Sequence, residues 1–133
     1  CNKPLNLKNM KRIINTDAAP KPIGPYSQAI NFRKLIFTSG QVALNEQGVI
    51  ATEDIKEQTR IVIENLRKIL KEGGSSLFNV IKTTVFLKDM NDFAQMNEVY
   101  NEFFEKVLPA RSTVEVARLP KDAKVEIEVI AYI

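Results

Sequence analysis

The residues best suited to chemistry in this chain are an arginine and two glutamates near its C-terminus. Arg111 opens the run RSTVEVA, and Glu126 and Glu128 lie in the run KVEIEVIAYI. An arginine at the start of a strand can hold a small carboxylate through two parallel charge-assisted hydrogen bonds, and a glutamate can activate or position water. The structural alternatives are a cross-strand salt bridge between Arg111 and one glutamate, or side chains that simply face solvent.

Three further segments carry candidate binding residues. Tyr26, in IGPYSQ, lies on a stiff proline-rich loop, where its ring either covers a ligand or packs over the sheet edge. Ser39 and Gly40, in TSGQV, either offer a ligand a hydroxyl and a close backbone approach or mark a strand bulge. Asn97 lies beside an apolar helical stripe and needs a hydrogen-bond partner, which is either a ligand or the backbone.

The composition excludes several kinds of catalysis. Among the 133 residues there is no histidine, and Cys1 is the single cysteine. Ser-His-Asp and Cys-His mechanisms are therefore excluded, as are the usual zinc sites, so we expect no metal. Any chemistry must use carboxylates, arginine, lysine, tyrosine, hydroxyls, backbone groups and water.

Charge and the N-terminal segment bear on partners and location. The formal net charge is +3, but Lys3 and Lys8 belong to the N-terminal tail and the charges of the body are mixed in sign, so nucleic acid is not indicated as a partner. No apolar run reaches membrane-spanning length, and no signal peptide is recognised. We interpret residues 1–9 as a disordered extension and predict a cytoplasmic protein; the alternative is a lipid anchor on Cys1.

Hydrophobic periodicity predicts the element order β-β-β-α-β-α-β-β. Thr52 is the expected cap of the first helix, Gly73 and Gly74 end it, and Pro109 ends the second. The predicted strands are residues 11–15, 29–32, 35–38, 80–88, 111–117 and 124–133, and the predicted helices are residues 53–72 and 92–108.

The last strand alternates with a period of two residues, which predicts one buried face. We interpret the last two strands as a hairpin that directs Arg111, Glu126 and Glu128 away from the core, and parity does not distinguish the two glutamates. The core-facing residues are Val125, Ile127, Val129, Ala131 and Ile133, and the opposite face carries Lys124, Glu126, Glu128, Ile130 and Tyr132.

These elements predict a single α/β (α+β) domain over residues 10–133, with one mixed sheet and both helices packed on one face. The other face of the sheet then has no helix to cover it. Because Ile130 and Tyr132 on that side are apolar, we expect another subunit to cover it.

Four segments together strongly resemble the RidA family, also called the YjgF or L-PSP endoribonuclease family: IGPYSQA, FTSGQV, VIKTTVFLKDMNDFAQMNEVYNEFF and PARSTVEVARLPKDAKVEIEVIAYI. The resemblance runs from about Lys11 to the last residue. It implies a chorismate-mutase-like fold and a homotrimer, with the sheets in a central barrel and clefts between subunits. It also implies cofactor-independent hydrolysis of 2-imino acids, typically 2-iminobutanoate and 2-iminopropanoate, to 2-keto acids and ammonia.

The resemblance assigns roles residue by residue. Arg111 corresponds to the residue that binds the substrate carboxylate, and Glu126, in preference to Glu128, to the one that positions or activates water. Tyr26 corresponds to the aromatic residue that closes over the ligand. At Thr113 many members have cysteine, so we expect contacts there to come from the backbone. The cleft-lining positions are Ser39, Gly40, Asn97 and Thr113.

Two other functions belong to different classes. An endoribonuclease or translation inhibitor acting on RNA would need a basic groove with stacking aromatic residues, whereas this chain has no tryptophan and a nearly neutral body. The third alternative is a trimer that binds a small ligand, or acts as a chaperone, without turnover.

Overall fold

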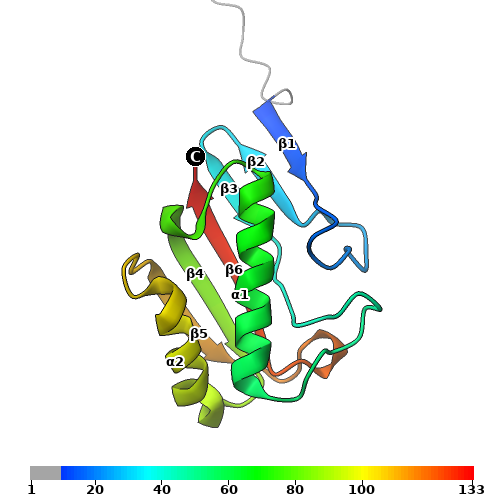
Figure 1. Ribbon diagram of the computed structural model, residues 1–133, viewed down its shortest axis with the longest axis vertical. Helices are drawn as coiled ribbons and strands as arrows, with labels where there is room; N and C mark the ends of the chain where they lie inside the picture. Colours follow the sequence, from blue (N-terminus) through cyan, green and yellow to red (C-terminus); the bar gives the residue numbers. More distant parts are fainter. Residues whose placement is uncertain (1–9) are drawn as a thin grey trace, which may run out of the picture.

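The computed structural model describes residues 10–133, so the predicted tail at residues 1–9 lies outside the described residues. The order of elements is the predicted one (Figure 1). Short 3₁₀ turns precede β4, α2 and β6. The strands are β1 (Lys11–Ile14), β2 (Ala29–Phe32), β3 (Leu35–Thr38), β4 (Val80–Leu87), β5 (Ala110–Glu115) and β6 (Val125–Tyr132), and the helices are α1 (Ile55–Glu72) and α2 (Phe93–Phe104).

Both helices are shorter than predicted, for local reasons. The N-cap of α1 is Asp54, whose carboxylate accepts a hydrogen bond from the Glu57 N–H at 3.0 Å, while Thr52 accepts one from the Asp54 N–H just outside the helix. Helix α2 ends at Phe104 rather than near Pro109, because Leu108 adopts a left-handed backbone conformation (φ 51°) and donates its N–H to the Phe104 carbonyl.

The two closing strands do not form the predicted hairpin. The sheet order is β1-β2-β3-β6-β4-β5, with β5 parallel to β4 and every other neighbouring pair antiparallel. The physical reason is that the chain runs from β4 to β5 through α2, and a crossover helix returns the chain parallel to the strand it left. Strand β6 instead fills the centre of the sheet, where its alternate apolar residues gain full burial.

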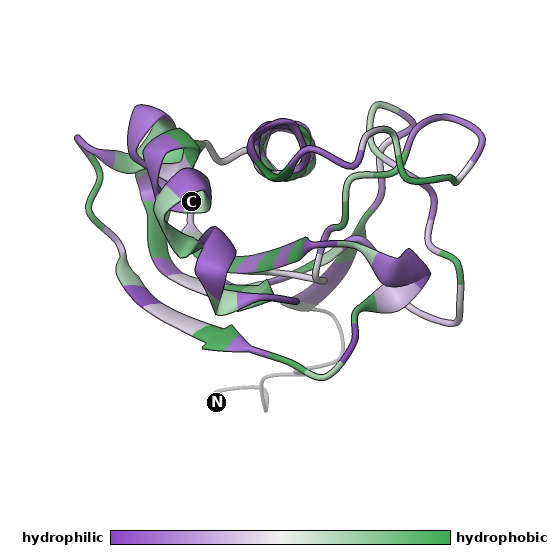
Figure 2. Cartoon of the chain, turned by 90° about the horizontal axis from the view of Figure 1, so that it is seen from below, coloured by the Kyte–Doolittle hydropathy of each residue, from purple (hydrophilic) through white to green (hydrophobic). Residues whose placement is uncertain are grey.

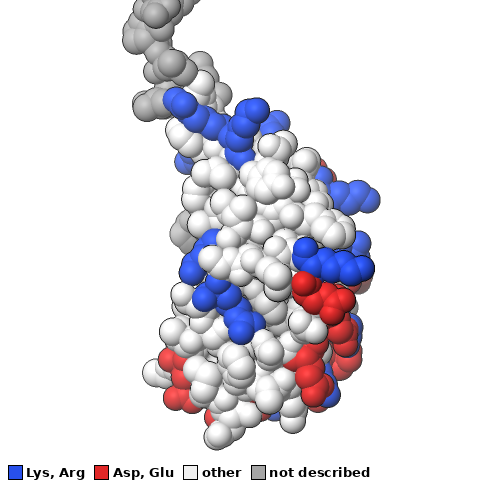
Figure 3. Space-filling model, turned by 90° about the vertical axis from the view of Figure 1, so that its left-hand side faces the viewer, with Lys and Arg blue, Asp and Glu red and all other residues white. Residues whose placement is uncertain are grey.

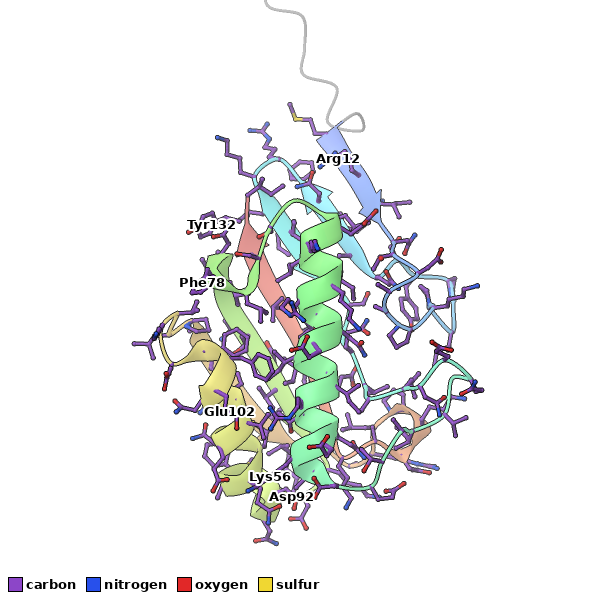
Figure 4. All side chains as sticks on the ribbon, viewed as in Figure 1. Arg12, Lys56, Phe78, Asp92, Glu102 and Tyr132 are labelled. Carbon is purple, nitrogen blue, oxygen red and sulfur yellow. The ribbon has the colours of Figure 1, made fainter. Side chains whose placement is uncertain are left out.

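The helices lie on one side of the sheet and enclose the core against it, as predicted (Figure 2). Val62, Leu66 and Ile69 of α1 pack there against the apolar face of β6, and each such side chain contributes about 1.5–3 kcal/mol when fully buried. Two ion pairs join the outer surfaces of the two helices, Lys56 with Glu98 and Arg60 with Glu102. Figure 4 labels one member of each pair, Lys56 of α1 and Glu102 of α2. Because these pairs are exposed, their contribution to stability is small.

The opposite face of the sheet carries no helix (Figure 2) and exposes large apolar side chains. Cross-strand partners on this open face include Leu35 with Tyr132 and Phe37 with Ile130, so the predicted orientation of Ile130 and Tyr132 is confirmed. Tyr132 is 46% exposed and Phe37 is 41% exposed. Exposed apolar surface of this kind is common where proteins contact a partner.

Figure 3 shows the side of the molecule that carries α2 and β5. Acidic and basic side chains gather along its right-hand margin, and much of the remaining surface in view is uncharged. Within residues 10–133, no helix is both long and apolar enough to cross a membrane.

Candidate functional site

A cavity of about 510 Å³ lies where the loop before β2, the end of β3 and β6 meet. Four predicted site residues line it: Tyr26, Ser39, Gly40 and Glu126. We call this set the carboxylate half. Glu128 lines the same cavity, on the same face of β6 as Glu126.

Gly40 allows the chain after β3 to pass directly against Glu126. A Cβ atom at position 40 would lie 2.8 Å from Cδ of Glu126, nearer than real side chains approach. Beside Gly40, Gln41 and Ile127 exchange backbone hydrogen bonds of 2.9 and 3.2 Å, which fixes the approach. Three residues, 38–40, lie here opposite two residues, 128–129, so the bulge considered at Gly40 is also present.

The hydroxyls of Ser39 and Tyr26 each make one hydrogen bond within the described part of the chain, the first as donor and the second as acceptor. Ser39 Oγ donates to the Ser27 carbonyl at 2.6 Å, and Tyr26 Oη accepts a hydrogen bond from the Ile23 N–H at 3.2 Å. The Tyr26 ring itself is 47% exposed at the cavity, with Gly24 packed beside it. Tyr26 therefore offers an apolar ring to a ligand, and Ser39 acts mainly by fixing the loop to the sheet.

Glu126 has a half-buried carboxyl group. Burial raises the pKa of the Glu126 carboxyl above its ordinary value, and the negative charge of Glu128 raises it further. The neutral form is thereby favoured over a wider pH range than in an exposed glutamate. A carboxyl group in this state can both accept and return a proton.

The second group of predicted residues lies between β5 and α2. Arg111 Nη1 donates a hydrogen bond of 2.7 Å to Asn97 Oδ1. On the same side of β5, Thr113 carries a buried hydroxyl that has no hydrogen-bond partner in the described part of the chain. We call Arg111, Asn97 and Thr113 the guanidinium half.

The guanidinium group is also held by two aromatic rings of α2 that the sequence analysis did not single out as site residues. Its Cζ atom lies 4.6 Å from the centre of the Tyr100 ring and 5.5 Å from that of Phe93. The Tyr100 hydroxyl is anchored by Thr83 at 2.8 Å. The spacing of Phe93, Asn97 and Tyr100 could have indicated this cluster, because positions 93, 97 and 100 share one helical face.

Arg111 and Glu126 face opposite sides of the sheet, which corrects the prediction that they share the outer face. Arg111 is in register with Thr83 of β4, and Thr83 is in register with the core residue Val129 of β6. Glu126 is paired with Phe86 and faces the open side. The predicted face was wrong because β5 is paired with β4 and not with β6.

Two of the alternatives from the sequence can be compared with the structure. Among residues 10–133, Arg111 forms no salt bridge with Glu126 or Glu128, and Asn97 Oδ1 accepts its hydrogen bond from the Arg111 side chain and not from the backbone. The same residues contain no cluster of three or more histidine, cysteine or acidic side chains able to hold a metal ion. The chemistry available is carboxylate recognition in one half and proton transfer in the other.

Substitution of Gly40 by alanine tests the close approach to Glu126. Gly40→Ala is expected to displace the Glu126 carboxyl, because the new methyl group overlaps the end of that flexible side chain, and to lower the free energy of unfolding by no more than about 1 kcal/mol. Chemical denaturation measures this loss. The double variant Gly40→Ala/Glu126→Ala should recover most of it relative to Glu126→Ala alone; equal losses in both backgrounds would show that Glu126 is not the obstacle.

The sequence matches the family model described as endoribonuclease L-PSP over residues 16–133. It is 58% identical over 123 residues to a RutC family protein of Pyrococcus abyssi, in an alignment that covers 92% of this chain and 97% of that protein. The match thus extends over almost the whole chain.

Solved structures agree with the fold. Escherichia coli TdcF, solved with bound serine and named provisionally as a reactive intermediate deaminase, is 47% identical with a TM-score of 0.86, and the match covers 92% of this chain and 98% of that one. The Escherichia coli YjgF gene product is 45% identical with a TM-score of 0.86, covering 91% and 98%. The chain therefore belongs to the endoribonuclease L-PSP family, also called the RidA or YjgF family.

Proposed function

We propose that this protein hydrolyses small 2-imino acids, such as 2-iminobutanoate and 2-iminopropanoate, to 2-keto acids and ammonia. The family membership and the name of TdcF support a deaminase of reactive intermediates. TdcF was solved with bound serine, a small amino acid that carries a carboxylate and a nitrogen on the same carbon atom, as a 2-imino acid does. The observation that carries the proposal is the way in which Arg111 is held.

The guanidinium of Arg111 is held in place, but only some of its N–H groups have hydrogen-bond partners. Asn97 accepts from Nη1, and Tyr100 supports the flat face of the group. A guanidinium has five N–H donors, so an edge remains for the two oxygens of a carboxylate. A 2-imino acid held there has its orientation fixed before water attacks, which is a large part of what catalysis requires.

The second half of the proposed reaction belongs to Glu126. With the imine nitrogen already protonated, the Glu126 carboxylate accepts a proton from water while the water oxygen bonds to the C=N carbon, and the C=N π electrons pass to the nitrogen to give a carbinolamine. Glu126 then returns its proton to the nitrogen. The C–N bond breaks, ammonia leaves, and the hydroxyl gives its proton back to the Glu126 carboxylate, and from there to solvent, as it becomes the keto group. Each tenfold gain in rate requires about 1.4 kcal/mol of transition-state stabilisation, and imines already hydrolyse in water.

Because the two halves face opposite sides of one sheet, the proposal requires a second copy of the chain. We propose a homotrimer in which the carboxylate half of one subunit meets the guanidinium half of its neighbour. The apolar residues of the open face support this arrangement, since Leu35, Phe37 and Tyr132 would be covered by the neighbouring subunits.

The function is tested by trapping 2-iminobutanoate with semicarbazide while an amino-acid oxidase generates it. The wild-type protein is expected to divert the imine and suppress semicarbazone formation. Arg111→Ala should lose this effect because the substrate carboxylate is no longer held, and Glu126→Gln should lower turnover about 100-fold or more.

The matched control is Arg67→Ala, which removes an exposed arginine paired with Glu64 on α1. It should retain wild-type activity. No suppression by a correctly folded wild-type protein would contradict the deaminase function, and RNA cleavage, which the family description names, would then be assayed in its place.

The raised pKa of Glu126 makes a further prediction about pH. If ionised Glu126 is the base, activity falls as pH decreases through its pKa. Glu128→Gln removes the neighbouring negative charge, so the pKa of Glu126 should fall and the acidic limb of the rate profile should move to lower pH. The profile of kcat/KM against pH measures the shift, with Glu72→Gln on α1 as control; an acidic limb that stays in place or moves upward would contradict this role of Glu128.

A further inference from the structure

One buried glutamine holds the loop that carries Tyr26. Gln28, directly before β2, is only 1% exposed and lines the cavity of the carboxylate half. Its Oε1 accepts from the Thr16 N–H at 2.7 Å, and its Nε2 donates to the carbonyls of Thr16 at 3.0 Å and Pro20 at 2.9 Å. The Gln28 side chain thus both accepts from and donates to the backbone of the loop, as the backbone of a neighbouring strand would.

The loop has little else to hold it. Residues 16–26 form no strand or helix, and Pro20, Pro22 and Pro25 have no N–H to donate. Within residues 10–133, every hydrogen bond from this segment to the rest of the protein ends on the Gln28 side chain. The remaining bonds of the segment are local, such as Ile23 N–H to Tyr26 Oη.

The backbone of Gln28 connects the same point to the floor of the cavity. Its carbonyl accepts from the Ser39 N–H at 2.8 Å, and its own N–H donates to Asn15 Oδ1 at 3.2 Å. Ser39 is followed by Gly40, against which Glu126 lies. Gln28 therefore joins the wall formed by Tyr26 to the segment that places the carboxyl group.

We propose that Gln28 is a positioning residue that fixes the Tyr26 wall relative to Glu126. It contacts no reacting atom in this account; it acts through Tyr26. Its effect on turnover rests on the proposed function, whereas its effect on the loop does not. The two are therefore measured separately.

Gln58 supplies a matched control. It is also fully buried, and its amide likewise joins two backbone groups, donating to the Thr52 carbonyl at 2.8 Å and accepting from the Lys124 N–H at 2.9 Å. It does not line the cavity. Gln28→Met and Gln58→Met thus remove equivalent bonds at different places, and both should lower stability.

Hydrogen exchange is the readout that needs no activity. Gln28→Met should speed amide exchange across residues 16–26, including the Thr16 N–H, while Gln58→Met should leave that segment as in the wild type. If Gln28→Met does not fold, Gln28→Glu keeps the shape and the acceptor but loses the two Nε2 donors, and the same result is expected. Unchanged exchange in the loop would overturn the proposal.

Turnover gives the second readout. In the imine assay Gln28→Met should raise KM about tenfold or more with a smaller change in kcat. The reason is that a displaced Tyr26 ring weakens substrate binding more than it slows the chemical step. In a Tyr26→Ala background the same substitution should have little further effect. Additive effects, or an equal rise in KM for Gln58→Met, would overturn the positioning role. An inactive wild type with the expected exchange pattern would instead contradict only the proposed function.

Discussion

The parallel pairing of β5 with β4 is the constraint on which the rest of the structure depends. Because α2 carries the chain across the sheet, β5 lies at the edge with Arg111 directed towards α2. There Asn97, Tyr100 and Phe93 hold the guanidinium through a hydrogen bond and two aromatic faces. β6 is left to fill the centre, and its polar residues face the other side of the sheet. One topological feature therefore separates the positive and negative groups of the site.

The carboxylate half depends on a different constraint, the absence of a side chain at Gly40. It lets the chain after β3 lie directly against the Glu126 carboxyl, whose pKa is raised by burial and by the charge of Glu128. Gln28 connects this region to the loop of Tyr26. Each half is thus held by contacts within its own chain, which suits the proposed assembly, in which two surfaces dock to complete a cleft.

Much of the local structure could be predicted from the sequence, because periodicity and turn residues act over short distances. Strands 29–32 and 35–38 are confirmed at both ends, and both helices are present. Pairing partners could not be predicted, since alternation defines the faces of one strand without saying which strand lies beside it. For that reason Glu126 was placed on the correct face and Arg111 was not. The roles of Gly40 and Gln28 depend on contacts between distant segments, which no local pattern reveals.

The proposed trimer takes Arg111 and Glu126 of one cleft from different chains. Arg111→Ala and Glu126→Ala are each expected to be inactive; the most direct measurement is the imine-trapping activity of an equal mixture of the two, unfolded and refolded together. In a cyclic trimer, every mixed assembly contains one cleft with both residues intact, so random mixing should restore about a quarter of wild-type activity. Mixed trimers that remain inactive would show that both residues act within one chain and would contradict the account.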